Sequence, residues 1–337
     1  MKKITGLLAA GFALFAGQAM AATLDDVKAR GFINCGVSEG VPGFSNPNAE
    51  GDWKGFDVDM CRALSAAIFN DPTKIKFVPL ASKQKVLAVV TGQVDLTSRT
   101  TTWTMKRDTK EGVDFTSVVF FDGQGFMTRK QNGAASAMDL NGATVCVTAG
   151  TTTELNLEDF ARANSLEFEP VVFEGKKEAV NAYRSGRCDA LTTDASQLAA
   201  FRITMPDPAE HVILPEIFSK EPLAPLVKHG DNAWKDLVTW TINGLITAEE
   251  TGVTQGNASE QKASSKNPTV QRMLGVTGDY GSYLGLENDW LYNAIKAVGN
   301  YGEIYDRNLG SESPLNMPRG KNALWTKGGL LYVAPLR

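Results

Sequence analysis

The sequence has 337 residues, of which 43% are hydrophobic and 21% charged, so it can bury real cores, and collagen-like, mucin-like or mainly disordered chains are excluded. Its formal net charge of -4, without a basic block, argues against nucleic acid or anionic lipid as the main partner. At about 150 residues per domain, the length predicts about two compact units.

The first predicted element is a signal peptide over residues 1–21. Residues 1–3 are a short positive start, residues 4–17 are an almost uninterrupted apolar run, and residues 19–21 have the small-x-small form of a cleavage site. The run is shorter than the roughly 20 residues that span a bilayer. An amphipathic or buried N-terminal helix is the alternative. We expect an exported protein that is cleaved near Ala21.

After the signal peptide, strand and helix patterns alternate. A β-type run at residues 32–37 precedes a stretch from Phe56 to Ile68 whose apolar residues recur at helical spacing. A strand at residues 75–80 and a helix at residues 86–90 follow. This alternation predicts an α/β fold with a largely parallel sheet.

An internal echo divides the chain into two similar halves. Residues 86–97 resemble residues 180–191, and in each segment a helix is stopped by a glycine, Gly92 or Gly186, and continues directly into a strand. A cysteine-bearing strand precedes each segment. We therefore predict two α/β lobes of similar construction.

The cysteines follow the same division. An even number in an exported chain favours disulfides, and each lobe would hold one pair, Cys35 with Cys61 and Cys146 with Cys188. Zinc is a competitor, but the cysteines form no C-x-x-C pair and the sequence has only two histidines, His211 and His229. Four unpaired core thiols are the other alternative.

The lobes are expected to be joined by a two-stranded hinge. The chain is predicted to cross near residues 125–129 and to return near residues 223–227. The region from about residue 231, which includes an amphipathic helix at residues 234–246, then has to pack back on the first lobe. The predicted boundaries are residues 22–126 and 224–337 for lobe 1 and residues 127–223 for lobe 2.

Three polar segments stand where strands of such a fold end, which is where ligands bind in open α/β sheets. Residues 100–107 combine clustered hydroxyls with Arg107, although an N-capped helix with a surface arginine is the alternative. Thr151 and Glu154 fit a capping box that leaves backbone N–H groups free for an anion. Asp194 lies eight residues after Gly186, as Thr100 lies eight after Gly92, and a plain helix cap is the alternative. An arginine facing a carboxylate across a cleft is the complement of a zwitterion.

At these residues the sequence resembles the polar amino-acid-binding family of periplasmic solute-binding proteins, which serve ABC importers. The motifs that carry the resemblance are Gly55-Phe-Asp-Val-Asp59, Thr100 to Arg107, Asp114-Phe-Thr, Gly150-Thr-Thr and Asp194. They cover about residues 30–250, and the remainder is similar to the longer subgroup of general L-amino-acid-binding proteins. The resemblance implies a type II periplasmic binding protein, with a central, mostly parallel sheet flanked by helices in each lobe and a two-stranded hinge.

The resemblance also implies ligand roles. Arg107 is expected to pair with the ligand α-carboxylate, helped by Thr102 and Thr152, and Asp194 is expected to hold the α-ammonium with Thr100 nearby. These residues would therefore bind the α-carboxylate and the α-ammonium, which all amino acids share.

Side-chain specificity is expected from Ser38, Ser82, Lys85 and Arg99. The chain departs from relatives selective for cationic side chains, because Val41 and Ser82 stand where those relatives place aromatic rings and Ser38 replaces an acidic residue. This predicts a pocket that does not select one class of ligand side chain, and therefore broad specificity. Lys85 and Arg99 would favour acidic or amide side chains, unless they are solvated.

The function implied is capture of L-amino acids in the periplasm by a monomer that docks on a membrane permease, without chemistry and without a cofactor or metal. The main rival is a dehydratase-like enzyme on the same scaffold. Against it, neither histidine falls in a predicted ligand segment and no Ser-His-Asp arrangement is evident. A ligand-binding module of a signalling receptor would use the same pocket.

Overall fold

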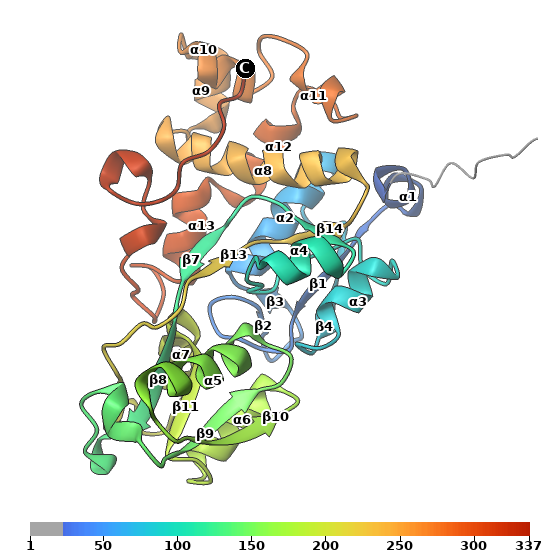
Figure 1. Ribbon diagram of the computed structural model, residues 1–337. Helices are drawn as coiled ribbons and strands as arrows, with labels where there is room; N and C mark the ends of the chain where they lie inside the picture. The colour runs from blue at the N-terminus through green and yellow to red at the C-terminus, as the bar shows by residue number, and fades with distance from the viewer. Residues whose placement is uncertain (1–22) are drawn as a thin grey trace, which may run out of the picture.

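The computed structural model of the protein describes residues 23–337, so the predicted signal peptide lies outside the described residues. Figure 1 shows two lobes, with the strands β7 and β13 running between them and the C-terminal helices at the end of the molecule remote from the second lobe. Within residues 23–337 no helix combines the length and the hydropathy that crossing a membrane requires.

The first lobe is built on a five-stranded sheet. Its order is β4 (Ile75–Leu80), β1 (Ile33–Ser38), β5 (Leu96–Thr97), β14 (Leu226–Lys228) and β6 (Val113–Phe115). Strand β1 is parallel to β4 and β5, whereas β14, which the returning chain contributes, is antiparallel to β5 and β6. The strands predicted at residues 32–37 and 75–80 are confirmed to within one residue.

Helices of this lobe follow the predicted apolar spacing. Helix α2 (Phe56–Phe69) buries Phe56, Met60 and Leu64, and α3 (Lys85–Val90) buries Ala88 and Val89. The other elements of this part are α1 (Thr23–Arg30), α4 (Met105–Lys110), β2 (Asn46–Pro47) and β3 (Trp53–Lys54).

The second sheet repeats the first. Its order is β10 (Glu169–Phe173), β9 (Thr144–Thr148), β11 (Ala190–Asp194), β8 (Gln124–Arg129) and β12 (His211–Ile213), with α5 (Thr152–Asn164), α6 (Lys176–Arg184) and α7 (Ala195–Arg202). Strands β10, β9 and β11 are parallel, and β8 is antiparallel to β11. Gly92 (φ 73°) and Gly186 (φ 83°) both adopt the left-handed conformation after their helices. The similar construction of the two halves is therefore confirmed.

Two antiparallel strands connect the sheets. Strand β7 (Phe120–Asp122) pairs with β13 (Glu221–Leu223), so that Asp122 stands opposite Glu221. The chain leaves the first lobe through β7 and returns through β13. Two such sheets with a two-stranded connection form the type II periplasmic binding protein fold that the resemblance implied.

The C-terminal region is helical and packs on the first lobe. The helix predicted at residues 234–246 extends further, as α8, and α12 packs against α2 and α8. Trp234 is buried and its indole N–H donates to the Asp95 carbonyl oxygen at 2.9 Å. The helices are α8 (Asn232–Glu250), α9 (Ala258–Ser264), α10 (Pro268–Met273), α11 (Tyr280–Tyr283), α12 (Trp290–Val298) and α13 (Tyr301–Asn308).

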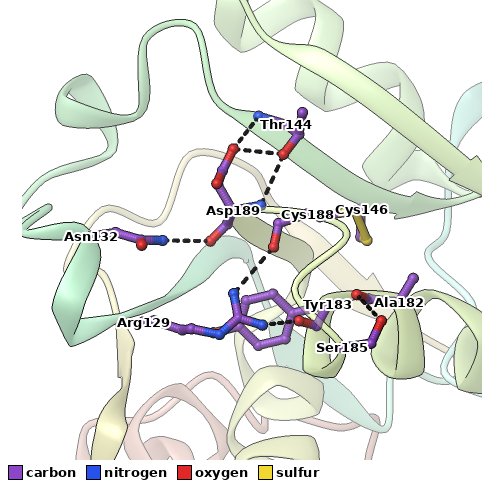
Figure 2. The surroundings of a disulfide bond; sticks show 9 residues. All are labelled: Arg129, Asn132, Thr144, Cys146, Ala182, Tyr183, Ser185, Cys188 and Asp189. Carbon is purple, nitrogen blue, oxygen red and sulfur yellow. Dashed lines mark hydrogen bonds between the residues drawn. A yellow bond between two sulfur atoms is a disulfide. The ribbon is translucent and has the colours of Figure 1, made fainter.

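Both predicted disulfides are present, Cys35–Cys61 and Cys146–Cys188. The first joins β1 to α2. The second joins β9 to the segment between α6 and β11, where the guanidinium of Arg129 donates to the Cys188 carbonyl oxygen at 3.3 Å (Figure 2). Each disulfide thus ties a central strand of one lobe to a neighbouring element.

We expect peptide mapping without reductant to recover these two cross-linked pairs. Because the cysteines of each pair are 26 and 42 residues apart, loop-closure entropy predicts that each bond adds about 3.5 to 4 kcal/mol to the free energy of unfolding. Denaturant titration of the oxidised protein and of the separate Cys35→Ala/Cys61→Ala and Cys146→Ala/Cys188→Ala variants measures this difference. Free thiols in the exported protein would contradict the pairing.

Candidate ligand-binding site

A small cavity lies between the two lobes, beyond the ends of strands β5, β9 and β11. Its free volume of about 20 Å³ is far below the roughly 300 Å³ of typical small-molecule sites, so the two lobes lie close together around it. All three polar segments singled out in the sequence reach it. The wall consists of Ser82, Lys85, Arg99, Thr100, Thr102, Thr151, Thr152, Thr153, Lys176, Thr193, Asp194 and Gln197.

The structure brings together most of the residues predicted to bind ligand. Five of those that line the cavity come from the first lobe and two from the second: Ser82, Lys85, Arg99, Thr100, Thr102, Thr152 and Asp194. Two predicted residues lie elsewhere. Ser38 is buried at the end of β1, and the buried Arg107 lies behind the wall, where its guanidinium donates to the Thr102 carbonyl oxygen at 2.9 Å.

Buried cations surround part of the cavity. Burial lowers the pKa of Arg99 to about 10, and its guanidinium donates to the Leu80 carbonyl oxygen at 2.9 Å and to Ser82 Oγ at 3.3 Å. Burial, followed by repulsion from Arg107, Arg99 and Lys176, lowers the pKa of Lys85 well below its usual range. Lys85 and Arg99 are therefore buried rather than solvated. A negatively charged or strongly dipolar ligand group would relieve this repulsion.

Asp194 lies at the opposite lobe's strand end, the last residue of β11. Burial, followed by repulsion from Asp122 and Glu221, raises its pKa to about 8, whereas Lys176 acts in the opposite direction. Its carboxylate accepts a hydrogen bond from the Gln197 side chain. Asp194 occupies the N-cap position of α7, as the alternative expected, but within the described part of the chain its side chain makes no capping hydrogen bond to that helix.

Thr100 holds an unusual backbone conformation on the wall. Its φ is 45°, in the left-handed region that β-branched residues rarely adopt. Burial raises the pKa of the neighbouring Asp57 to about 7, and the hydrogen bond that Ser98 Oγ donates at 3.1 Å opposes that shift. Asp57 is thus a buried carboxylate in the first turn of α2, held by Ser98.

Both expected helix starts are observed. Thr104 caps α4 by accepting from the Arg107 N–H at 3.3 Å, yet Arg107 is buried, so the alternative of a surface arginine is wrong. Thr151 Oγ1 accepts from the Glu154 N–H at 3.2 Å. The Glu154 carboxylate accepts from the Gly150 N–H at 2.9 Å rather than from the capping residue, so the predicted box is shifted by one residue.

Sequence reasoning missed Lys176, Gln197 and Glu221. Lys176 donates to Gln197 and to Thr100 Oγ1 at 3.4 Å, and burial lowers its pKa to about 8. Lys176 begins α6 and Lys85 begins α3, but the two lysines are 91 positions apart and the internal echo has an offset of 94, so the echo did not mark Lys176. Glu221 comes from the returning hinge strand, which no motif marks.

A larger hollow, of about 650 Å³, lies on the first lobe between α2, β4 and the C-terminal helices. Its charged side chains already pair with one another, because Asp59 accepts from Arg62 at 3.4 Å and from Arg307 at 2.9 Å. The smaller cavity between the lobes instead gathers buried charges of both signs from separate elements. We therefore place the ligand site between the lobes.

Comparison with known proteins agrees with the residue patterns. The family model described as bacterial extracellular solute-binding proteins, family 3, matches residues 33–254. The chain is 53% identical to the general L-amino acid-binding periplasmic protein AapJ of Rhizobium johnstonii, over 98% of this chain and 97% of that protein. It is 50% identical to the glutamate/glutamine/aspartate/asparagine-binding protein BztA of Rhodobacter capsulatus, over 96% of each.

Among solved structures, a periplasmic binding protein of an ABC transporter from Brucella ovis with glutathione bound is 54% identical. The match covers 94% of this chain and 100% of that chain, with a TM-score of 0.92. The motifs, the two-lobed fold and these matches lead to one conclusion: the chain belongs to the bacterial extracellular solute-binding proteins, family 3.

Proposed function

We propose that this protein is the periplasmic substrate-binding component of an ABC importer and that it captures L-amino acids between its lobes. In this proposal lobe 1 comprises residues 22–126 and 224–337, lobe 2 comprises residues 127–223, and the signal peptide is removed near Ala21. The protein acts as a monomer without catalysis and delivers its ligand to an inner-membrane permease.

The observation that carries the proposal is the pairing of opposite charges across one buried cavity. Asp194 comes from the second lobe, whereas Arg99 and the nearby Arg107 come from the first. Buried charges are costly unless they are paired. An amino acid supplies an ammonium for Asp194, with Thr100 beside it, and a carboxylate for Arg107, which completes both pairs.

The rest of the cavity sets the preference for the ligand side chain. Ser82, Lys85 and Arg99 are joined by Lys176, and the cations suit acidic or amide side chains. The Rhodobacter relative is named for binding glutamate, glutamine, aspartate and asparagine. The Rhizobium relative is named for general L-amino acid binding, which fits broad specificity. Neither Ser38 nor Arg107 lines the cavity; we keep Arg107 because its guanidinium is held against Thr102 of the wall, and we leave Ser38 out.

The mechanism is capture by closure. A ligand that contacts both lobes binds the closed form more tightly than the open form, so binding shifts the population toward closure by that difference in affinity. The strands β7 and β13 absorb the rotation between the lobes. The closed form then docks on the permease.

One observation keeps the enzyme alternative open. Burial places the pKa values of Asp194 and Lys176 near neutral pH, which is what acid–base catalysis requires. A solved ancestral amino acid-binding protein, 28% identical and with a TM-score of 0.58, is described as a precursor of cyclohexadienyl dehydratase. Turnover of a bound ligand would favour this alternative.

Calorimetric titration of the refolded, ligand-stripped mature protein against the L-amino acids tests the proposal. We expect tight binding of several L-amino acids at one site, the acidic and amide ones foremost, without turnover. Their D-enantiomers and dipeptides are the controls. Absence of binding to every amino acid would refute the proposed function and direct attention to enzyme assays on the same cavity.

Ligand binding is expected to release protons at neutral pH. The raised pKa of Asp194, about 8, keeps its carboxyl protonated at pH 7 despite Lys176 and Gln197 beside it, with Asp122 and Glu221 repelling it. A ligand ammonium favours the ionised form, so affinity should rise as pH increases toward 8. Calorimetry in two buffers of different ionisation enthalpy counts the protons released. Proton uptake would contradict the role of Asp194.

A further inference from the structure

Glu221 is a buried carboxylate at the hinge whose hydrogen bonds come from three separate parts of the chain. Its side chain is 1% exposed. One oxygen, Oε2, accepts from the hydroxyls of Thr102 and Thr152, the latter at 2.9 Å. The other, Oε1, accepts from Asn156 Nδ2 at 2.7 Å and from Ser219 Oγ at 2.7 Å. Every oxygen of this carboxylate is thus satisfied by side chains.

These partners belong to different lobes. Thr102 follows β5 of the first sheet, whereas Thr152 and Asn156 stand in the first two turns of α5, which covers the second sheet. The two threonine hydroxyl oxygens are 3.3 Å apart. Rotation of the lobes about β7 and β13 would separate Thr102 from Thr152, so that one carboxylate could no longer accept from both. Opening therefore leaves a buried charge with fewer partners, which is unfavourable.

Glu221 lies near a carboxylate, which repels it, and near a cation, which attracts it. Asp122 stands opposite it on the paired hinge strand. Burial lowers the pKa of Arg107, and the carboxylates Glu111 and Glu221 counteract that shift, so Arg107 acts as a nearby counter-charge. The hydroxyls of Thr102 and Thr152 add charge-assisted hydrogen bonds on the side of the cavity. Glu221 thus has hydrogen-bond donors and a nearby cation while the lobes are together.

A threonine hydroxyl has one hydrogen to donate. Because Thr102 and Thr152 both donate to Glu221, they have no hydrogen left for a ligand carboxylate. We propose that Glu221 is a closure latch: it joins the two lobes through these hydroxyls, and Thr102 and Thr152 act on the ligand through Glu221 and not by donating to its carboxylate. The ligand part of this inference rests on the proposed function.

Small-angle scattering of the ligand-free protein tests the latch without reference to any ligand. Glu221→Ala should increase the radius of gyration of the ligand-free protein relative to wild type, because the open form gains population. Glu221→Gln should give an intermediate value, since its single carbonyl oxygen can still accept from both hydroxyls. Glu210→Gln, which changes a 61%-exposed carboxylate, is the matched control and should leave the value unchanged. An unchanged radius in both Glu221 variants would overturn the latch.

A double-mutant cycle tests the threonine assignment. With L-glutamine as the probe, Thr152→Val and Glu221→Ala should each raise the Kd by about tenfold, whereas Thr152→Val added to Glu221→Ala should change it less than about twofold. An equal effect of Thr152→Val in both backgrounds would mean that this hydroxyl binds ligand directly and would overturn the assignment. If Glu221→Ala does not fold, Glu221→Gln replaces it in the cycle. If wild type binds no amino acid, the proposed function fails while the scattering result still decides the latch.

Discussion

Alanine at position 194 is expected to remove nearly all amino-acid affinity from a protein that still folds. Asp194 is 4% exposed and is the carboxylate that the second lobe contributes to the cavity wall. Without it, the ligand ammonium would be buried beside Lys176 with no carboxylate to pair with it. Leaving one side of a buried charge pair unpaired costs about 3 to 5 kcal/mol, so the Kd should rise by about two to three and a half orders of magnitude.

In contrast to ligand affinity, the free energy of unfolding is not expected to fall in the Asp194→Asn variant. A carboxyl whose folded pKa is raised, here to about 8, holds its proton in the folded state while the unfolded chain has lost it. Stability is therefore lost as pH rises from the unfolded value, about 4, toward 8. Asparagine removes this pH-dependent loss. The ligand-free Asn variant should thus be at least as stable as wild type at pH 7, with a smaller decline toward pH 8.

Denaturant titration and calorimetry on the same samples separate the two effects. Asp159→Asn is the matched control, because this carboxylate lies on the same lobe with 68% of its side chain exposed, and the change should alter neither quantity. Near-normal binding by a folded Asp194→Ala protein would remove Asp194 from the site. Loss of binding together with loss of stability in the Asn variant would instead indicate a structural role.

The fold could be predicted because the two halves of the chain carry the same pattern of strands and helices. Each lobe repeats the same order of strands, and Gly92 and Gly186 mark the same helix-to-strand turn in each. Local patterns also fix the strands and helices, since α2 carries its apolar residues at helical spacing. The length of α8, which continues to Glu250, was underestimated because its last turns hold polar residues that tertiary packing keeps helical.

The site could be predicted only where it lies at strand ends with recognisable motifs. Thr100 and Thr152 lie in the segments after β5 and β9, and Asp194 ends β11, so their convergence is set by sheet topology. Glu221 reaches the site through the return strand, whose short sequence has no periodicity and whose register opposite Asp122 exists only in the folded hinge. Burial could not be predicted from the sequence: Lys85 and Arg99 are expected to contribute to specificity unless they are solvated, and only the folded structure shows that both are buried.

Arg107 provides the second large expected effect. It is 8% exposed, and its guanidinium is fixed by the Thr102 carbonyl oxygen behind the cavity wall. Arg107→Met removes the charge that we assign to the ligand α-carboxylate, so affinity should fall by about 100-fold or more. It also leaves the Thr102 carbonyl without this donor, which should reduce the free energy of unfolding by about 1 to 3 kcal/mol. Arg107→Lys keeps a charge but loses the planar fork, so its affinity should lie between those of the Met variant and wild type.

Changing the ligand tests the contact between Arg107 and the ligand α-carboxylate separately from any effect of the substitution on stability. The α-amide of glutamine lacks the carboxylate, so wild type should bind glutamine far more tightly than the amide, whereas Arg107→Met should bind both almost equally. This ratio is insensitive to a general loss of stability, because both ligands meet the same protein. Arg162→Lys, at a side chain that is 77% exposed on α5, is the control and should preserve the wild-type ratio. If Arg107→Met kept that ratio too, the carboxylate would have to be held by another cation, and Arg99, already on the cavity wall, is the group that the geometry offers.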